Sequence, residues 1–186
     1  VTYTGLIGGD VFNGTYTGAF SDKNVGTGKT VTITSSYGGA DVNNYTITDQ
    51  ANTTADIFKK ALTATASASN KVYDSSDTAT TTLTLSGLVG TETLNVTNTS
   101  TFNNKNVGTG KSVTVNSITL ADGSNGGLAA NYSISPGQTT TANVTAKALT
   151  VSGITASNKI YDGNTVATID ISTINYGGLV SGDDVV

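Results

Sequence analysis

The chain lacks several residue types on which enzymes and metal sites depend. Its 186 residues include no cysteine, histidine, methionine or tryptophan. Without cysteine, neither disulfide bonds nor thiolate metal sites can form. Without histidine, the commonest general base and the commonest metal ligand are both missing. Catalysis would therefore need a pair of carboxylates, and the sequence offers no acidic pair with convincing partners. We predict that the protein is not an enzyme.

Charged residues are also scarce, at 12% of the chain with a net charge of −4. A surface that binds nucleic acid needs clustered Lys and Arg, so no nucleic-acid partner is expected. No apolar run approaches the about 18 residues that a membrane helix requires, so no membrane insertion is expected. The first residues lack methionine and any signal-like segment, which is typical of a piece cut from a longer protein.

The sequence repeats itself at an interval of about 82 to 91 residues. The segment KNVGTGK that begins at Lys23 returns unchanged at Lys105, and NYTI at Asn44 returns as NYSI at Asn131. This interval is too long for the unit of a solenoid and matches a small independent domain. We therefore predict three parts: residues 1–60 are a repeat that lacks its first strands, residues 61–147 are a complete repeat, and residues 148–186 begin a third.

Apolar and polar residues alternate with a period of two almost throughout the chain. The segments TVTIT from Thr30 and TLTL from Thr82 are examples, and glycine or Asn/Asp clusters interrupt such runs. This pattern predicts an all-β fold of small antiparallel β-sandwiches of the Ig-like type, with β-grasp-like modules as the alternative. Residues 141–151 join two repeats without proline, glycine or a charge cluster. The repeats should therefore follow each other directly and form a stiff rod.

The GTGK segments invite comparison with a nucleotide-binding P-loop. That pattern requires glycine where Lys23 and Lys105 stand, and it leads into a helix, whereas the residues from Thr30 alternate as a strand. We therefore interpret each segment as a turn in which Val25 or Val107 packs into the core. The glycines that would supply the turn geometry are Gly26, Gly28, Gly108 and Gly110.

We expect no cofactor, with calcium as the one weak alternative. Aspartates in glycine-rich loops offer the oxygen ligands that calcium prefers, although none has the spacing of an EF-hand. A covalent cross-link between Lys71 or Lys159 and an asparagine also stays open. The asparagines considered for it are Asn24 and Asn106. The calcium candidates are Asp10, Asp122, Asp183 and Asp184.

The segment SNKIYDGNT from Ser157, followed by GLV at residues 178–180 and by a Gly-Asp pair, resembles the YDG repeat of large bacterial surface adhesins of the filamentous-haemagglutinin type. In that repeat a dKNVGTGK segment, an NYT strand and a TAxIxxKxLT exit follow. The resemblance covers essentially the whole chain, although Ser75 stands in place of the glycine in one copy. We interpret the motif as a tight turn with its tyrosine ring on the core. Its residues are Tyr73, Asp74, Tyr161, Asp162 and Gly163.

This resemblance implies an extracellular protein at the bacterial cell surface, in which the repeats form a stalk or filament. The expected partners are neighbouring repeats of the same chain, or head-to-tail copies in which residues 148–186 of one molecule complete residues 1–60 of another. The alternative is a module that binds a glycan or a host surface receptor through exposed tyrosines. Its candidate residues are Tyr3, Tyr16, Tyr37 and Tyr176.

Overall fold

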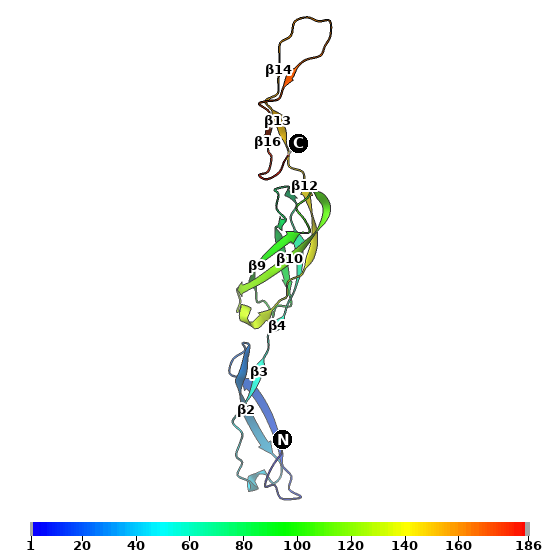
Figure 1. The fold of residues 1–186 in the computed structure, drawn as a ribbon. Helices are drawn as coiled ribbons and strands as arrows, with labels where there is room; N and C mark the ends of the chain where they lie inside the picture. The colour runs from blue at the N-terminus through cyan, green and yellow to red at the C-terminus, as the bar shows by residue number, and fades with distance from the viewer. Residues whose placement is uncertain (1, 185–186) are drawn as a thin grey trace.

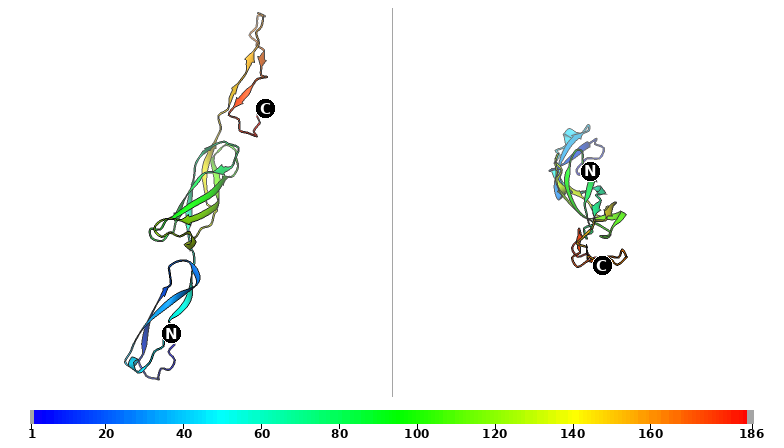
Figure 2. Two further views of the ribbon diagram at one scale, coloured as in Figure 1. Left: turned by 90° about the vertical axis from the view of Figure 1, so that its left-hand side faces the viewer. Right: turned by 90° about the horizontal axis from the view of Figure 1, so that it is seen from above.

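The computed structural model describes residues 2–184 and has the shape of a long, narrow rod (Figure 1). Three units follow one another along its axis, and the view from above shows how small their common footprint is (Figure 2). All regular elements of residues 2–184 are β-strands or short 3-10 turns, so the prediction of an all-β fold is confirmed. In that part of the chain no helix is long and apolar enough to cross a membrane.

The first unit is a single antiparallel sheet in the order β1-β2-β3. The alternating segment that begins at Thr30 lies in the long strand β2, whose register with β1 runs from Asn13 opposite Gly38 to Phe20 opposite Val31. Within residues 2–184 no further strand pairs with either outer strand of this sheet. The elements are β1 (Asn13–Phe20), β2 (Gly26–Gly38), the 3-10 turn η1 (Val42–Asn44) and β3 (Asn52–Ile57).

The central unit repeats that sheet and adds strands around it. Its five-stranded sheet has the order β6-β12-β10-β9-β7, in which β9, β10 and β12 correspond to β1, β2 and β3. The hairpin β5-β8 forms a second sheet, and β4 pairs with β11. The elements are β4 (Lys60–Ala61), β5 (Thr63–Ala68), β6 (Lys71–Val72), β7 (Thr78–Ala79), β8 (Thr81–Ser86), β9 (Leu94–Phe102), β10 (Gly108–Asp122), η2 (Ala129–Asn131), β11 (Tyr132–Ser133) and β12 (Thr139–Thr145).

The core of the described chain lies in this central unit. All buried apolar side chains of residues 2–184 fall between Leu62 and Val144. Alternation along β10 turns Val113 and Val115 inward, where both are almost completely buried. The hairpin covers this face, since β5 contacts β12 and β8 contacts β9. The main core cluster consists of Ala79, Phe102, Val113, Ala142 and Val144.

Within the predicted all-β fold, two short pairings of the central unit are parallel and not antiparallel. Strand β4 pairs with β11, and β6 pairs with β12, in a parallel sense. The reason is the path of the chain, because the first and the last strands of this unit run side by side in the same direction. The chain consequently enters the unit at one end and leaves it at the other, as an end-to-end array requires.

The third unit consists of two short antiparallel pairs, β13 with β16 and β14 with β15. Thr150 lies opposite Gly177, which is the same register as Thr63 opposite Ser86 in the hairpin β5-β8 of the central unit. The hairpin of the third unit therefore has the pairing of the central one. Its strands are β13 (Thr150–Ser152), β14 (Thr155–Ala156), β15 (Ile169–Asp170) and β16 (Asn175–Gly177).

Phe102 and Phe20 occupy the same position in two repeats, but Phe102 is 3% exposed and Phe20 is 40% exposed. Phe102→Ala should therefore lower the stability of the central unit by about 3 to 5 kcal/mol, because it leaves a cavity in a closed core. Phe20→Ala should change stability by no more than about 1 kcal/mol. Calorimetric unfolding of both variants measures this, and equal losses would contradict the assigned core.

Candidate functional site: lysine cages and the junctions between units

The GTGK segments form a β-bulge at the start of β2 and of β10. The register shifts by one residue between Gly26 and Lys29, and again between Gly108 and Lys111. The third residue of each bulge has a left-handed backbone, with φ of +60° at Gly28. Glycine adopts this conformation without steric penalty, which accounts for the glycine and for the likeness to a P-loop.

Each bulge directs its lysine back into the preceding loop, where backbone and side-chain oxygens surround the ammonium group. Lys111 is buried and donates to the carbonyl and the Oδ1 of Asn104, both at 2.7 Å, and to the carbonyl of Asn106. A Cβ at Gly108 would lie 3.2 Å from the Lys111 stem, so this glycine lets the stem pass. We call this arrangement a lysine cage. Val107 is exposed, so its expected packing into the core is wrong, because the loop folds around the lysine instead.

The first unit has the same cage with one change of charge. Lys29 donates to the carbonyl of Asn24 at 2.8 Å and contacts the carboxylate of Asp22, which replaces Asn104 of the central unit. The hydrogen bond from Lys29 holds the pKa of Asp22 below its usual value, and the backbone N–H of Asn24 adds to this effect.

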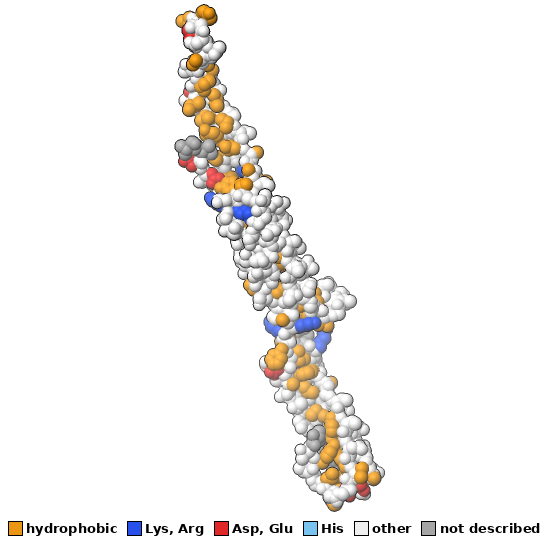
Figure 3. All heavy atoms as spheres, turned by 90° about the vertical axis from the view of Figure 1, so that its right-hand side faces the viewer, with side chains coloured by type: hydrophobic (Ala, Val, Ile, Leu, Met, Phe, Trp, Pro, Cys, Tyr) orange, Lys and Arg blue, Asp and Glu red, His pale blue; other side chains and the backbone are white. Residues whose placement is uncertain are grey.

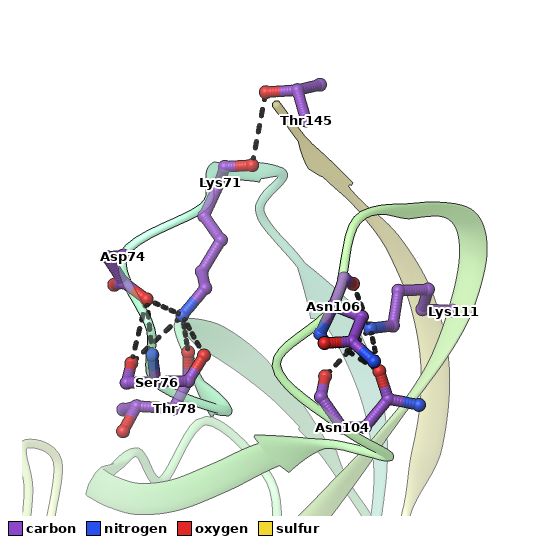
Figure 4. A network of polar contacts seen from close by, with 8 residues as sticks. All are labelled: Lys71, Asp74, Ser76, Thr78, Asn104, Asn106, Lys111 and Thr145. Atoms are coloured by element: carbon purple, nitrogen blue, oxygen red, sulfur yellow. Dashed lines mark hydrogen bonds and ion pairs between the residues drawn. The ribbon is translucent and has the colours of Figure 1, made fainter. Parts of the chain in front are cut away.

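The Tyr-Asp motif forms a second kind of cage (Figure 4). Lys71 donates to Oδ1 of Asp74 at 2.7 Å, to the carbonyl of Ser76 at 2.8 Å and to the carbonyl of Thr78 at 3.1 Å. The backbone N–H of Ser76 also donates to Oδ1 of Asp74, at 2.9 Å, which closes an Asx turn. Both donors stabilise the carboxylate, Lys71 more than Ser76, and they lower the pKa of Asp74 to about 2.

In the third unit the same cage holds Lys159. Its ammonium donates to Oδ1 of Asp162 at 2.9 Å and to the carbonyl of Asn164 at 2.8 Å. The hydrogen bond from Lys159 lowers the pKa of Asp162. Lys71 and Lys159, the lysines considered for a covalent cross-link, are thus each held within their own loop.

The two cages of the central unit lie side by side at one end of it (Figure 4) and share an aromatic ring. The Nζ atoms of Lys71 and Lys111 lie 5.8 Å and 5.9 Å from the centroid of the Phe102 ring. A cation at this distance is attracted by the ring quadrupole. Phe102 therefore links the apolar core to both cages.

The junction between the first and central units centres on Glu92, in the loop that precedes β9. Its Oε1 accepts a hydrogen bond from Lys23 of the first unit at 3.3 Å, and its Oε2 accepts one from Tyr132 of its own unit at 2.6 Å. The hydrogen bond from Tyr132, followed by that from Lys23, lowers the pKa of Glu92, and the same contact raises the pKa of Tyr132. Beside it, Asn131 accepts from the backbone N–H of Val25 at 2.9 Å and donates to Asn24 at 3.0 Å.

The junction between the central and third units uses Asp183, which takes the place of Glu92 in the corresponding Gly-Leu loop. The hydroxyl of Tyr73 donates to Oδ1 of Asp183 at 3.0 Å, and Nζ of Lys105 lies 4.0 Å from that atom. The ring of Tyr73 packs against the central core, so the tyrosine of the motif connects a core to the next unit. Blue lysine side chains mark both junctions in Figure 3. Tyr161, by contrast, is exposed, because no sheet comparable to that of the central unit forms within residues 148–184.

Sequence reasoning missed Glu92, although its signal is present. The loops GLIGGD, GLVGTE and GLVSGD end in Asp10, Glu92 and Asp183, so an acid recurs in all three copies. In the first unit Asp10 accepts the hydroxyl of Tyr45, which is the counterpart of Tyr132. Comparing the loops by chemical type rather than by residue identity would have found this position.

The four calcium candidates lie in separate settings. Asp10 and Asp183 accept tyrosine hydroxyls, Asp122 accepts the backbone N–H of Ala129 at 2.7 Å, and Asp184 is exposed. Among residues 2–184, no three acidic side chains come together as a metal site would need. The structure therefore adds no support for a calcium site.

The third residue of the Tyr-Asp motif has a left-handed backbone in both copies, with φ of +68° at Ser75 and +77° at Gly163. A residue with a Cβ is strained in this conformation. Ser75→Gly should therefore stabilise the central unit by about 1 kcal/mol, after allowance for the greater freedom of glycine in the unfolded chain. Thermal unfolding tests this, with Ser76→Gly as the contrasting variant, which loses the hydroxyl contacts with Lys71 and Asp74 and should melt at a lower temperature. A lower melting temperature for Ser75→Gly would contradict the prediction.

Asp74 should make the central unit sensitive to acid. Because its pKa is lowered from 3.8 to about 2 on folding, its stabilising contribution is present above pH 4 and is lost as the pH falls towards 2. Asp74→Asn should therefore unfold at a lower temperature than the wild type at pH 7, and the two should converge near pH 2. Asp77→Asn, at an exposed aspartate, is the control and should have the melting temperature of the wild type. A difference in melting temperature between Asp74→Asn and the wild type that does not change with pH would contradict the cage.

The repeated units match one known family of domains. A search of curated proteins found no match, and neither did a search of solved structures. The family model of the YDG domain, however, matches the chain three times, at residues 1–55, 58–142 and 145–186. The matches cover almost the whole chain and include the cages of Lys29, Lys71, Lys111 and Lys159. The chain therefore belongs to the YDG domain family.

Proposed function

We propose that the chain is a structural stalk segment of a bacterial cell-surface or secreted adhesin, which holds a binding region away from the cell. The observation that carries this proposal is the junction, where an acid of one unit accepts hydrogen bonds or an ion pair from the unit before it. The acid is Glu92 at one junction and Asp183 at the other. Because an acidic acceptor recurs at each junction, an array of such units would extend in one direction.

The covalent connection between units favours stiffness. Only Phe58 and Lys59 separate β3 of the first unit from β4 of the central unit. Strand β4 pairs at once with β11, and the N–H of Leu62 donates to the carbonyl of Ser133 at 2.8 Å. A linker fixed at both ends within a few residues leaves little freedom of rotation. Together with the polar junctions, it supports a rod rather than separate beads on a flexible string.

The composition suits an extracellular stalk. Neutral hydroxyl and amide side chains supply most of the polar surface. In the absence of disulfides, the lysine cages hold the loops next to the small cores. An individual ion pair with a largely exposed partner, such as Lys23 in the pair with Glu92, contributes little to stability. In a stalk, these ion pairs would instead set the orientation of one unit relative to the next.

The alternative function is binding of a glycan or another host ligand. It is favoured by one observation, which is that Tyr3, Tyr16 and Tyr37 line an open groove in the first unit. However, these side chains already engage one another and their neighbours: Tyr3 and Tyr16 share a hydrogen bond of 2.9 Å, and Tyr37 donates to Asp49. Tyr176 lies far away on β16. A screen of the chain against a glycan array tests this function, and saturable binding of one glycan class would favour it over the stalk.

Small-angle scattering of the wild-type chain should give the profile of a single elongated particle. Glu92→Ala removes the acceptor of both Lys23 and Tyr132, so it should broaden the distribution of angles at the first junction and shorten the mean particle. Thr91→Ala, an exposed neighbour, is the matched control and should scatter like the wild type. A compact wild-type particle would contradict the stalk function, and an unchanged Glu92→Ala profile would contradict the role of Glu92.

A further inference from the structure

The first and last segments of the central unit run in the same direction, and they pair at both ends of the unit. Lys60 lies opposite Tyr132 where the chain enters, and Val72 lies opposite Thr145 where it leaves. Between these two ladders β5 contacts β12. The entry at β4 and the exit at β12 lie at opposite ends of the unit (Figure 1). We call residues 60–73 the entry arm and residues 132–145 the exit arm.

Hydrogen bonds outside the two ladders also join the entry arm to the exit arm. The hydroxyl of Thr145 donates to the carbonyl of Lys71 at 3.3 Å (Figure 4). The others involve backbone N–H groups, and they occur near both ends of the arms. They run from Leu62 to the carbonyl of Ser133 at 2.8 Å, from Asn143 to Oδ1 of Asn70 at 2.7 Å, and from Tyr73 to the carbonyl of Thr145 at 2.8 Å.

Tension along the rod would pull the two arms in opposite directions. Only Phe58 and Lys59 connect the first unit to the entry arm, and residues 146–149 connect the exit arm to the third unit. The arms would therefore have to slide past each other along their own axes. Hydrogen bonds between two strands loaded in this way share the force and must break almost together. A pull on one end of a ladder instead breaks weak single bonds one after another.

Sliding of the arms would also disturb the core and a lysine cage. Val144 of the exit arm is 1% exposed and belongs to the main core cluster with Phe102. Lys71 of the entry arm holds the loop that follows through the carbonyls of Ser76 and Thr78. The far end of the entry arm is thus fastened to its own loop, and the exit arm is fastened to the core.

We propose that the entry and exit arms form a shear clamp, which lets the central unit bear tension along the rod without unfolding. This inference rests on the proposed stalk function, because a stalk transmits the force between its two ends. Forced unfolding is governed by the rate of unfolding and not by equilibrium stability. A unit with a small core can consequently resist force if its arms are loaded in shear.

Single-molecule force spectroscopy tests the clamp, because the chain has no cysteine of its own and handles can be attached at chosen positions. Phe58→Cys/Lys147→Cys places exposed handles at opposite ends of the arms, which loads them in shear. Phe58→Cys/Ala130→Cys places them at the same end, which peels the arms apart. At one loading rate, the central unit should unfold at a higher force in shear than in peeling. An equal or lower force in shear would overturn the proposal.

A variant between the two ladders separates the clamp from general stability. Asn70→Ala removes the acceptor of the Asn143 N–H, so it should lower the unfolding force in shear. The force in peeling should not change, because peeling starts at the other end of the arms. Exposed Ser69→Ala is the matched control and should leave both forces unchanged. Equal losses in both geometries for Asn70→Ala would contradict the clamp. Either failure leaves the stalk function untouched, because scattering of the unloaded particle tests that function separately.

Discussion

A three-stranded YDG sheet cannot bury its own apolar face, and the rest of the structure depends on this constraint. In the central unit the preceding hairpin covers the face and extends both edges, and the core closes around Phe102 and Val113. In the first unit the same sheet remains open, with Phe20 partly exposed. The repeat is therefore a sheet together with a cover, and neither part forms a closed core by itself.

The lysine cages add polar contacts to a unit whose core is small and which contains no disulfide. A core of small side chains contributes modest hydrophobic stabilisation. The cages fasten the loops at one end of the central unit, since Lys71 and Lys111 each satisfy several oxygens there and both lie against Phe102. Burying an ammonium group is costly unless oxygens accept its hydrogen bonds, so the burial of Lys111 depends on the loop that surrounds it.

The units are joined by an acid that belongs to one unit and accepts from another. Glu92 and Asp183 occupy equivalent loops, but their partners differ, because Tyr132 contacts Glu92 from its own unit and Tyr73 contacts Asp183 from the unit before. The tyrosine of the motif thus serves both its own core and the junction, while the aspartate beside it holds a cage. One motif consequently shapes a loop and orients the following unit.

Much of the fold could be predicted because it depends on local patterns. Alternation of residues such as those from Thr30 determines strands, and exact repetition of KNVGTGK determines that two units share a structure. The sequence also excluded a P-loop, since lysine stands at the required glycine. Only the tertiary structure decided that the first strands of a unit run parallel to its last ones, that Lys111 rather than Val107 is buried, and that Glu92 receives Lys23. These outcomes depend on which distant segments lie side by side, and no local periodicity encodes that contact.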